Sequence, residues 1–140
     1  MKKLPYVIVS LAVGLALTGV LAGCSGGGKA NVQAQIQALK TGDDNARQDA
    51  LAALAAVGPK AAPAVPVILE TIKATKDPVV RRLCAYALGE IGAPAATPAI
   101  PVLKEMVKGF DRDLSTTAYN ALWAIDPKSA DPNYKPINVQ

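Results

Sequence analysis

The sequence repeats itself at an offset of 34 residues, and this feature limits the possible folds more than any other. Residues 46–58 align with residues 80–92, and a third, partial copy follows at residues 114–125. Arg, Ala, Leu and Gly recur in the first two copies at positions 47/81, 53/87, 54/88 and 58/92. Such a period is typical of arrays in which each unit buries its apolar face against its neighbours. The repeat therefore predicts one stacked domain.

Each copy has the pattern of two helices. Asp43, Asp77 and Asp111 open the three copies, where an aspartate side chain can accept hydrogen bonds from the free N–H groups of a helix N-terminus. Gly58 and Gly92 close the first helices, as glycine does at a left-handed C-cap. Prolines cluster where each second helix starts, because a helix tolerates them only in its first turn. Helices are predicted over residues 31–41, 43–57, 63–75, 77–91, 98–108 and 111–125, the first as the second half of a unit whose first helix is missing.

The repeated pattern of Asp, Arg, Ala-Leu and Gly, followed by a proline-rich second helix, resembles HEAT repeats, most closely the short bacterial kind found in PBS-lyase-like proteins. The resemblance covers residues 43–126 well and 31–42 loosely, and the third copy departs from it at Ser115 and Asp126. It implies an all-α fold, a right-handed α-solenoid of about three helix pairs that occupies residues 31–126. Residues 127–140 contain three prolines, so we expect a non-helical tail or cap there.

The N-terminus has the pattern of an export signal. Two lysines precede an uncharged apolar run over residues 4–22, which is also just long enough to span a bilayer as a helix. The run ends in Leu-Ala-Gly-Cys, which resembles the bacterial lipobox. That resemblance implies a cleaved signal peptide at residues 1–23 and a lipidated Cys24, acylated with palmitate-type chains, followed by a flexible Gly-rich tether at residues 24–30. We therefore expect an extracytoplasmic protein anchored to a membrane by lipid, facing the periplasm from the outer membrane if the cell is Gram-negative.

Composition excludes several kinds of chemistry. The chain contains no histidine, which rules out His-based acid–base catalysis and His-ligated metals. After signal removal, 13 basic residues stand against 11 acidic ones, a balance too even to indicate a nucleic-acid partner. Cys84 is the single cysteine of the repeat domain and matches alanines in the sister copies, so we interpret it as a small core residue. We expect no enzyme activity, no cofactor and no metal.

The repeated Asp and Arg positions are interpreted as structural. Asp43 and Arg47, like Asp77 and Arg81, stand four residues apart, and Asp111 opens the third copy. HEAT repeats use such positions for stacking, so the resemblance implies helix caps plus a ladder of ion pairs between units. The alternative, an acid–base or anion site, fits less well because these residues recur with the repeat.

The candidate partner-binding residues differ between the units. The second helices line the concave face in HEAT proteins, and the charged residues predicted there are Glu70, Lys73, Lys104, Glu105 and Lys108. Tyr119 and Trp123 lie four residues apart on the last helix, either as core or cap residues or as contact surface. The resulting hypothesis is a membrane-tethered, non-enzymatic interaction or scaffold module with a protein or peptide partner. The alternatives are a PBS-lyase-like chromophore-handling or accessory enzyme and a nucleic-acid-binding solenoid.

Overall fold

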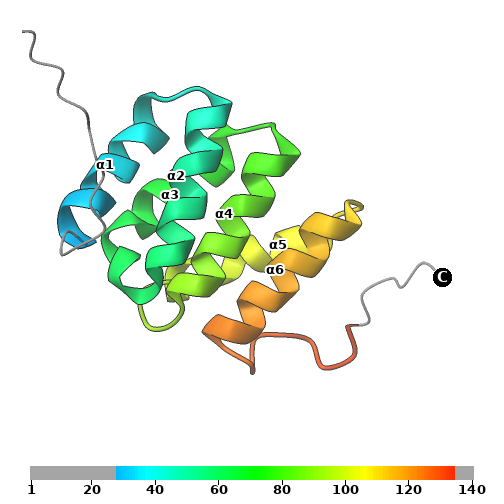
Figure 1. The fold of residues 1–140 in the computed structure, drawn as a ribbon. Coiled ribbons are helices and arrows are strands. Elements are labelled where there is room, and N and C mark those ends of the chain that lie inside the picture. The colour runs from blue at the N-terminus through cyan, green and yellow to red at the C-terminus, as the bar shows by residue number, and fades with distance from the viewer. Residues whose placement is uncertain (1–27, 135–140) are drawn as a thin grey trace, which may run out of the picture.

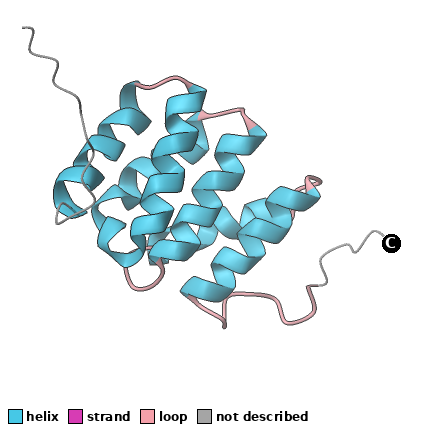
Figure 2. Cartoon of the chain, viewed as in Figure 1, coloured by secondary structure: helices cyan, strands magenta, loops and turns pink. Residues whose placement is uncertain are grey.

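The computed structural model describes residues 28–134, and this part of the chain is helical without a strand (Figures 1 and 2). The predicted signal peptide, Cys24 and residues 135–140 lie outside the described residues. The elements are α1 (Gly28–Thr41), α2 (Asp44–Val57), the 3₁₀ helix η1 (Gly58–Ala64), α3 (Val65–Ala74), α4 (Pro78–Ile91), the 3₁₀ helix η2 (Thr97–Ala99), α5 (Ile100–Val107) and α6 (Arg112–Ile125). The all-α prediction is confirmed.

Helix boundaries differ from the predicted ones in two places. Helix α1 begins at Gly28, so residues 28–30, which were assigned to the flexible tether, form its first turn. The second helices begin as 3₁₀ helix, and regular α-helix starts only at Val65 and Ile100. Pro63 and Pro98 explain this delay, because proline has no N–H with which to continue an α-helical ladder.

The six α-helices form two layers (Figure 1). Helices α2, α4 and α6 pack side by side in one layer, in chain order. In the other layer, α1 packs on α2, α3 on α4, and α5 on α6. The two helices with proline in their first turn, α3 and α5, thus pack most extensively on the helix that follows each of them. Helix α1 thus stands to α2 as α3 stands to α4 and α5 to α6, which is the place predicted for a second helix, and the described chain forms three helix pairs.

The core runs continuously between the layers because equivalent residues of each repeat are buried. Helices α2, α4 and α6 contribute two such positions each, all at most 2 % exposed: Ala50 and Leu54, Cys84 and Leu88, Ala118 and Leu122. The stretch Asp44–Ala74 is long and apolar enough, by length and composition, to cross a membrane. In the structure it is divided into α2, η1 and α3, which pack on other helices of the solenoid.

Two glycines end the first helices with a backbone that other residues rarely adopt. Gly58 has φ 64° and ψ −136°, and Gly92 has φ 68° and ψ −173°. The positive φ agrees with the predicted role, but the ψ angles lie far from the left-handed helical region. The predicted left-handed C-cap is therefore wrong in detail, because the chain turns out into an extended conformation that is nearly exclusive to glycine. This turn directs the chain from the first helix into the proline-rich segment.

Candidate functional site

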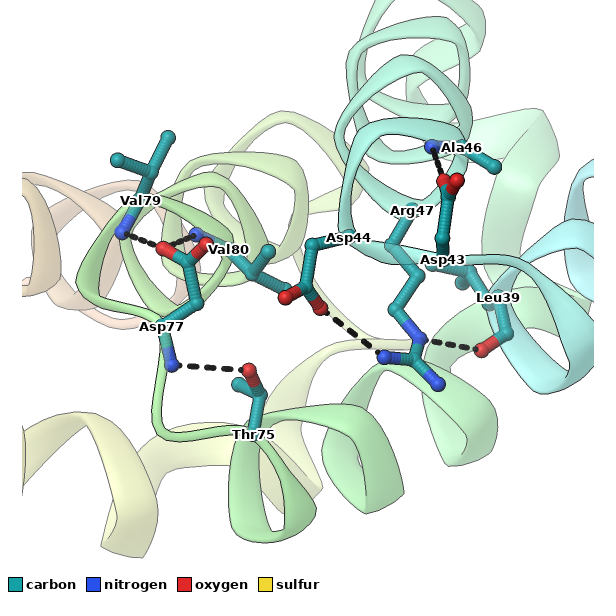
Figure 3. A network of polar contacts seen from close by, with 9 residues as sticks. All are labelled: Leu39, Asp43, Asp44, Ala46, Arg47, Thr75, Asp77, Val79 and Val80. Carbon is teal, nitrogen blue, oxygen red and sulfur yellow. Dashed lines mark hydrogen bonds and ion pairs between the residues drawn. The ribbon is translucent and has the colours of Figure 1, made fainter.

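The three repeated aspartates occupy helix N-cap positions. The Asp43 carboxylate accepts a hydrogen bond from the Ala46 N–H at 2.8 Å (Figure 3). Asp77 accepts from the N–H groups of Val79 and Val80, at 2.7 and 3.2 Å. Asp111 accepts from the Leu114 N–H at 3.0 Å. Each carboxylate thus caps the N-terminus of a different helix, α2, α4 or α6, and the three do not form a common acidic site.

The repeated arginines do not form the predicted ladder of ion pairs between stacked units. Arg47 Nε donates to the Leu39 carbonyl at 3.3 Å, and its Nη1 pairs with Asp44 of the same helix at 3.1 Å (Figure 3). Arg81 makes no ion pair within residues 28–134, and its Nε is buried without a hydrogen-bond partner there. The ladder prediction is wrong because Arg47 reaches an unpaired carbonyl at the end of α1 instead of the next unit.

One pair does join neighbouring units, but it was not predicted. Arg82 Nη1 on α4 lies 3.5 Å from the Asp113 carboxylate on α6, and both side chains are exposed. Exposed pairs of this kind contribute little, typically about 0–1 kcal/mol. The stacking of the units therefore depends on the buried apolar core.

A concave surface lies at the C-terminal end of the solenoid. We call it the C-terminal groove; its volume is about 650 Å³. Its lining comes from three segments: Pro101, Lys104, Glu105, Val107 and Lys108 at α5, Tyr119 and Leu122 on α6, and residues 128–132 of the tail. This size lies within the range of pockets that bind small ligands or side chains of a partner.

Four of the predicted partner-binding residues meet in this groove. Lys104, Glu105 and Lys108 project along α5, and Tyr119 faces them from α6. Lys108 Nζ lies 3.0 Å from the Glu105 carboxylate, with both side chains largely exposed. The helix α5 ends at Val107, so Lys108 stands at its C-cap, where a cation is favoured by the helix dipole.

The aromatic pair predicted on the last helix separates into two roles. The ring of Tyr119 is partly buried and stacks on Tyr134 of the tail, with centroids 4.4 Å apart. Trp123 is 58 % exposed and lies outside the lining of the C-terminal groove. Phe110, in the turn between α5 and α6, is fully exposed. Tyr119 therefore covers the core at the end of the solenoid and also lines the groove, whereas Trp123 is a surface residue.

Glu70 and Lys73 lie elsewhere. Glu70 lines a smaller groove of about 290 Å³ between α1 and α3, together with Leu39, Lys40 and Arg47. Lys73 is exposed on α3 and lines neither groove. The structure thus does not bring all five predicted charged residues into one groove, because Glu70 and Lys73 lie on α3 and the other three lie at α5.

The tail forms one wall of the groove: residues 127–134 are the expected non-helical cap, but their place beside a groove was not predicted. Asp126 accepts hydrogen bonds from the Ser129 hydroxyl at 2.7 Å and from the Lys128 N–H at 3.1 Å. The Ser129 hydrogen bond, followed by that of Lys128, lowers the pKa of the Asp126 carboxyl. The signal that could have indicated this turn is Asp-Pro-Lys-Ser, since an aspartate before proline commonly starts a turn.

Ser115 is the second residue missed. It takes the position of the repeated arginine, and its hydroxyl donates to the Val107 carbonyl at 2.6 Å. The same oxygen lies 2.7 Å from the Tyr134 hydroxyl. Ser115 therefore joins the end of α5 to the tail, and the departure from the repeat pattern at this position indicated a special role at the C-terminal end.

Within residues 28–134 the structure shows neither an accessible cysteine nor a cluster of metal ligands. Cys84 is fully buried, and burial raises the pKa of its thiol to about 12 despite the nearby Arg81 cation, so it stays protonated at neutral pH. No group of three Cys, Asp or Glu in this part of the chain could hold a metal ion. Cys24, the predicted lipidation site, lies outside the described residues.

A comparison with protein families gives one match: the model described as HEAT repeats aligns with residues 32–129. The match covers all six α-helices, including most of α1, which the repeat pattern alone covered loosely. No curated protein and no solved structure matches the chain.

Proposed function

Because the chain belongs to the HEAT-repeat family, we propose that it is a non-enzymatic protein-interaction module, held at a membrane by a lipid on Cys24. HEAT repeats form a helical module that is often used to bind other proteins. The observation that carries the proposal is the C-terminal groove, where Lys104, Glu105, Lys108 and Tyr119 surround a concave surface. A surface that combines apolar lining with a charged rim resembles a protein interface.

The proposal of a non-enzymatic role is supported by the side chains available. The whole chain lacks histidine, and the buried Cys84 thiol has a raised pKa and no access to a substrate. General acid–base or nucleophilic catalysis needs a group that titrates near the working pH or is activated by a neighbour. The C-terminal groove is lined only by lysines, carboxylates, hydroxyls and apolar groups, which suit recognition.

The proposed anchor would keep the domain close to the membrane surface. Helix α1 begins at Gly28, only four residues after Cys24, so the connection spans at most about 14 Å. Buried acyl CH₂ groups contribute about 0.8 kcal/mol each, and two or three chains hold a protein firmly. The module would therefore present its repeats to partners near the membrane.

Site-specific photo-crosslinking in membranes of the native host tests this proposal. A photoreactive amino acid at position 105 in the groove should yield a discrete protein adduct, whereas the same group at the exposed position 52 on α2 should not. Metabolic labelling with a clickable fatty acid should mark the parent chain but not Cys24→Ala. The interaction proposal fails if the adducts from positions 105 and 52 are the same, and the anchor proposal fails if Cys24→Ala keeps the label.

A further inference from the structure

We propose that the C-terminal groove binds an acidic segment of a partner protein that carries an apolar side chain. The inference rests on the proposed function, because it names the chemistry of the partner at the same groove. The argument uses the floor of the groove, the charges on its rim, and its position in the fold.

The floor of the groove is apolar and held in place from both sides. Val107, Tyr119 and Leu122 line it from the helices, and Ala130 lines it from the tail. The tail wall is fixed by the stacking of Tyr134 on Tyr119 and by the turn at Asp126. A preformed apolar floor favours an occupant with an apolar side chain, because little ordering is needed when it binds.

The lining of the groove carries three lysines against two carboxylates. Lys104, Lys108 and Lys128 are exposed there, against Glu105 and Asp131. Glu105 is paired with Lys108, and the Asp131 carboxylate accepts the Asn133 N–H at 2.8 Å. Lys104 and Lys128 form no ion pair with any residue in the described part of the chain. Both lysines act on the nearby Asp126 carboxylate, but no ion pair holds either ammonium group, so both can also meet an acidic occupant by charge complementarity.

The position of the groove favours a protein partner over the membrane itself. Helix α1, next to the proposed anchor, and helix α6 lie at opposite ends of the solenoid (Figure 1). The groove lies between α5, α6 and the tail, at the end of the solenoid opposite to α1 (Figure 1). A lysine pair placed there is better positioned to meet a soluble segment than lipid headgroups beside the anchor.

Fluorescence anisotropy with labelled synthetic peptides tests the inference on the full chain in phosphatidylcholine vesicles. Three short probes carry a central leucine flanked by glutamates, a central leucine flanked by lysines, and a central serine flanked by glutamates. The first should bind at least about tenfold more tightly than the other two, and added salt should weaken it.

Two double variants with the same change in net charge provide the matched comparison. Lys104→Glu/Lys128→Glu should weaken binding of the acidic leucine peptide about tenfold or more and improve binding of the basic one. Lys60→Glu/Lys76→Glu, which reverses two exposed lysines outside the groove, should leave both affinities within about twofold. Equal effects of the two double variants would overturn the inference.

Other outcomes separate this inference from the proposed function. Preferential binding of the basic peptide, lost in Tyr119→Ala, would reject an acidic partner but leave the groove as an interaction site. Failure of all three peptides to bind the parent chain would also reject the inference, while the photo-crosslinking result at position 105 would still decide the proposed function. Competition by phosphatidylglycerol vesicles that depends on Lys104 and Lys128 would assign the groove to lipid and overturn the proposal of a protein partner.

Discussion

The Ser115 hydroxyl donates to the Val107 carbonyl at 2.6 Å, eight residues back along the chain. Arg47 spans the same interval, from its Nε to the Leu39 carbonyl at 3.3 Å. Helix α2 in one repeat and helix α6 in the other thus supply a donor to a carbonyl at the C-terminal end of the preceding helix. Such a carbonyl has no partner within its own helix. The first and third repeats thus make the same connection with different residues, whereas Arg81 Nε, at the equivalent position of the middle repeat, has no hydrogen-bond partner among the described residues.

Removing the Ser115 hydroxyl should destabilise the C-terminal unit. Ser115 is buried, and its hydroxyl contacts both the Val107 carbonyl and the Tyr134 hydroxyl. We expect Ser115→Ala to lower the free energy of unfolding by about 1–3 kcal/mol, because it leaves buried polar groups unpaired. Urea denaturation followed by far-UV circular dichroism measures this. Thr117→Ala, which loses only a hydrogen bond to Asp113 of its own helix, should change stability by about 0.5 kcal/mol or less.

The two repeated arginines should respond differently to the same substitution. Arg47→Met removes the hydrogen bond to Leu39 and the ion pair with Asp44, and should cost about 1 kcal/mol. Arg81→Met keeps the aliphatic stem but removes a buried Nε that has no partner among the described residues. Its stability should be unchanged or higher, since an unpaired buried donor is unfavourable. A larger loss for Arg81→Met than for Arg47→Met in urea denaturation would contradict this account.

The sequence pattern predicts the helices well because it records local requirements. Asp43, Asp77 and Asp111 mark helix starts, and Gly58 and Gly92 mark helix ends, through backbone chemistry within a few residues. The pairing of helices is different, because a periodic sequence does not reveal where one unit ends and the next begins. Pairs α1–α2 and α2–α3 fit the same pattern, and only packing in three dimensions selects the first.

The candidate site was predicted only in part for a similar reason. Lys104, Glu105, Lys108 and Tyr119 share the C-terminal groove, but its second wall comes from the tail after Asp126. That wall depends on the contact between Tyr119 and Tyr134, which lie in different elements. A pattern of helical spacing contains no information on such a contact, since a tail without periodicity can take many paths.

Shortening a core residue in the middle unit should cause a large loss of stability. Leu88 is fully buried between the two layers, and Leu88→Ala should cost about 2–5 kcal/mol. A domain of this size has a total stability of about 5–15 kcal/mol. The midpoint of the unfolding transition should therefore move clearly to a lower urea concentration. Tyr86→Ala on the same helix is the matched control, because Tyr86 is about half exposed and should cost much less. Equal losses for the two variants would contradict the assigned core.

The Cys84 thiol should be unreactive until the domain unfolds. Burial raises its pKa to about 12, so very little thiolate forms at neutral pH, and the side chain has no exposed surface. Iodoacetamide treatment followed by peptide mass spectrometry should find Cys84 unmodified in the native chain and modified in urea. Rapid labelling of Cys84 under native conditions would show that α4 opens far more readily than its packing implies.

The turn at Asp126 should make the stability of the tail wall depend on pH. The hydrogen bond from Ser129, followed by that from the Lys128 N–H, lowers the pKa of the Asp126 carboxyl in the folded chain. Between the folded and unfolded pKa values the unfolded chain binds more protons, so stability rises with pH in this interval. The contribution is therefore complete above the unfolded pKa and is lost as the pH falls through the lowered folded value.

Ser129→Ala, which removes the largest cause of that shift, isolates the effect. The parent should be more stable than Ser129→Ala at neutral pH, and the difference should shrink in strongly acidic buffer, where Asp126 is protonated in both states. Urea denaturation followed by the fluorescence of Trp123, the single tryptophan, reports on α6 beside the turn. Ser115→Ala provides the comparison, because the hydroxyl that it removes does not titrate. The loss of stability in this variant should therefore stay nearly constant with pH. If the loss of stability in Ser129→Ala is equally independent of pH, the hydrogen bond to Asp126 does not stabilise the charged form of that carboxylate.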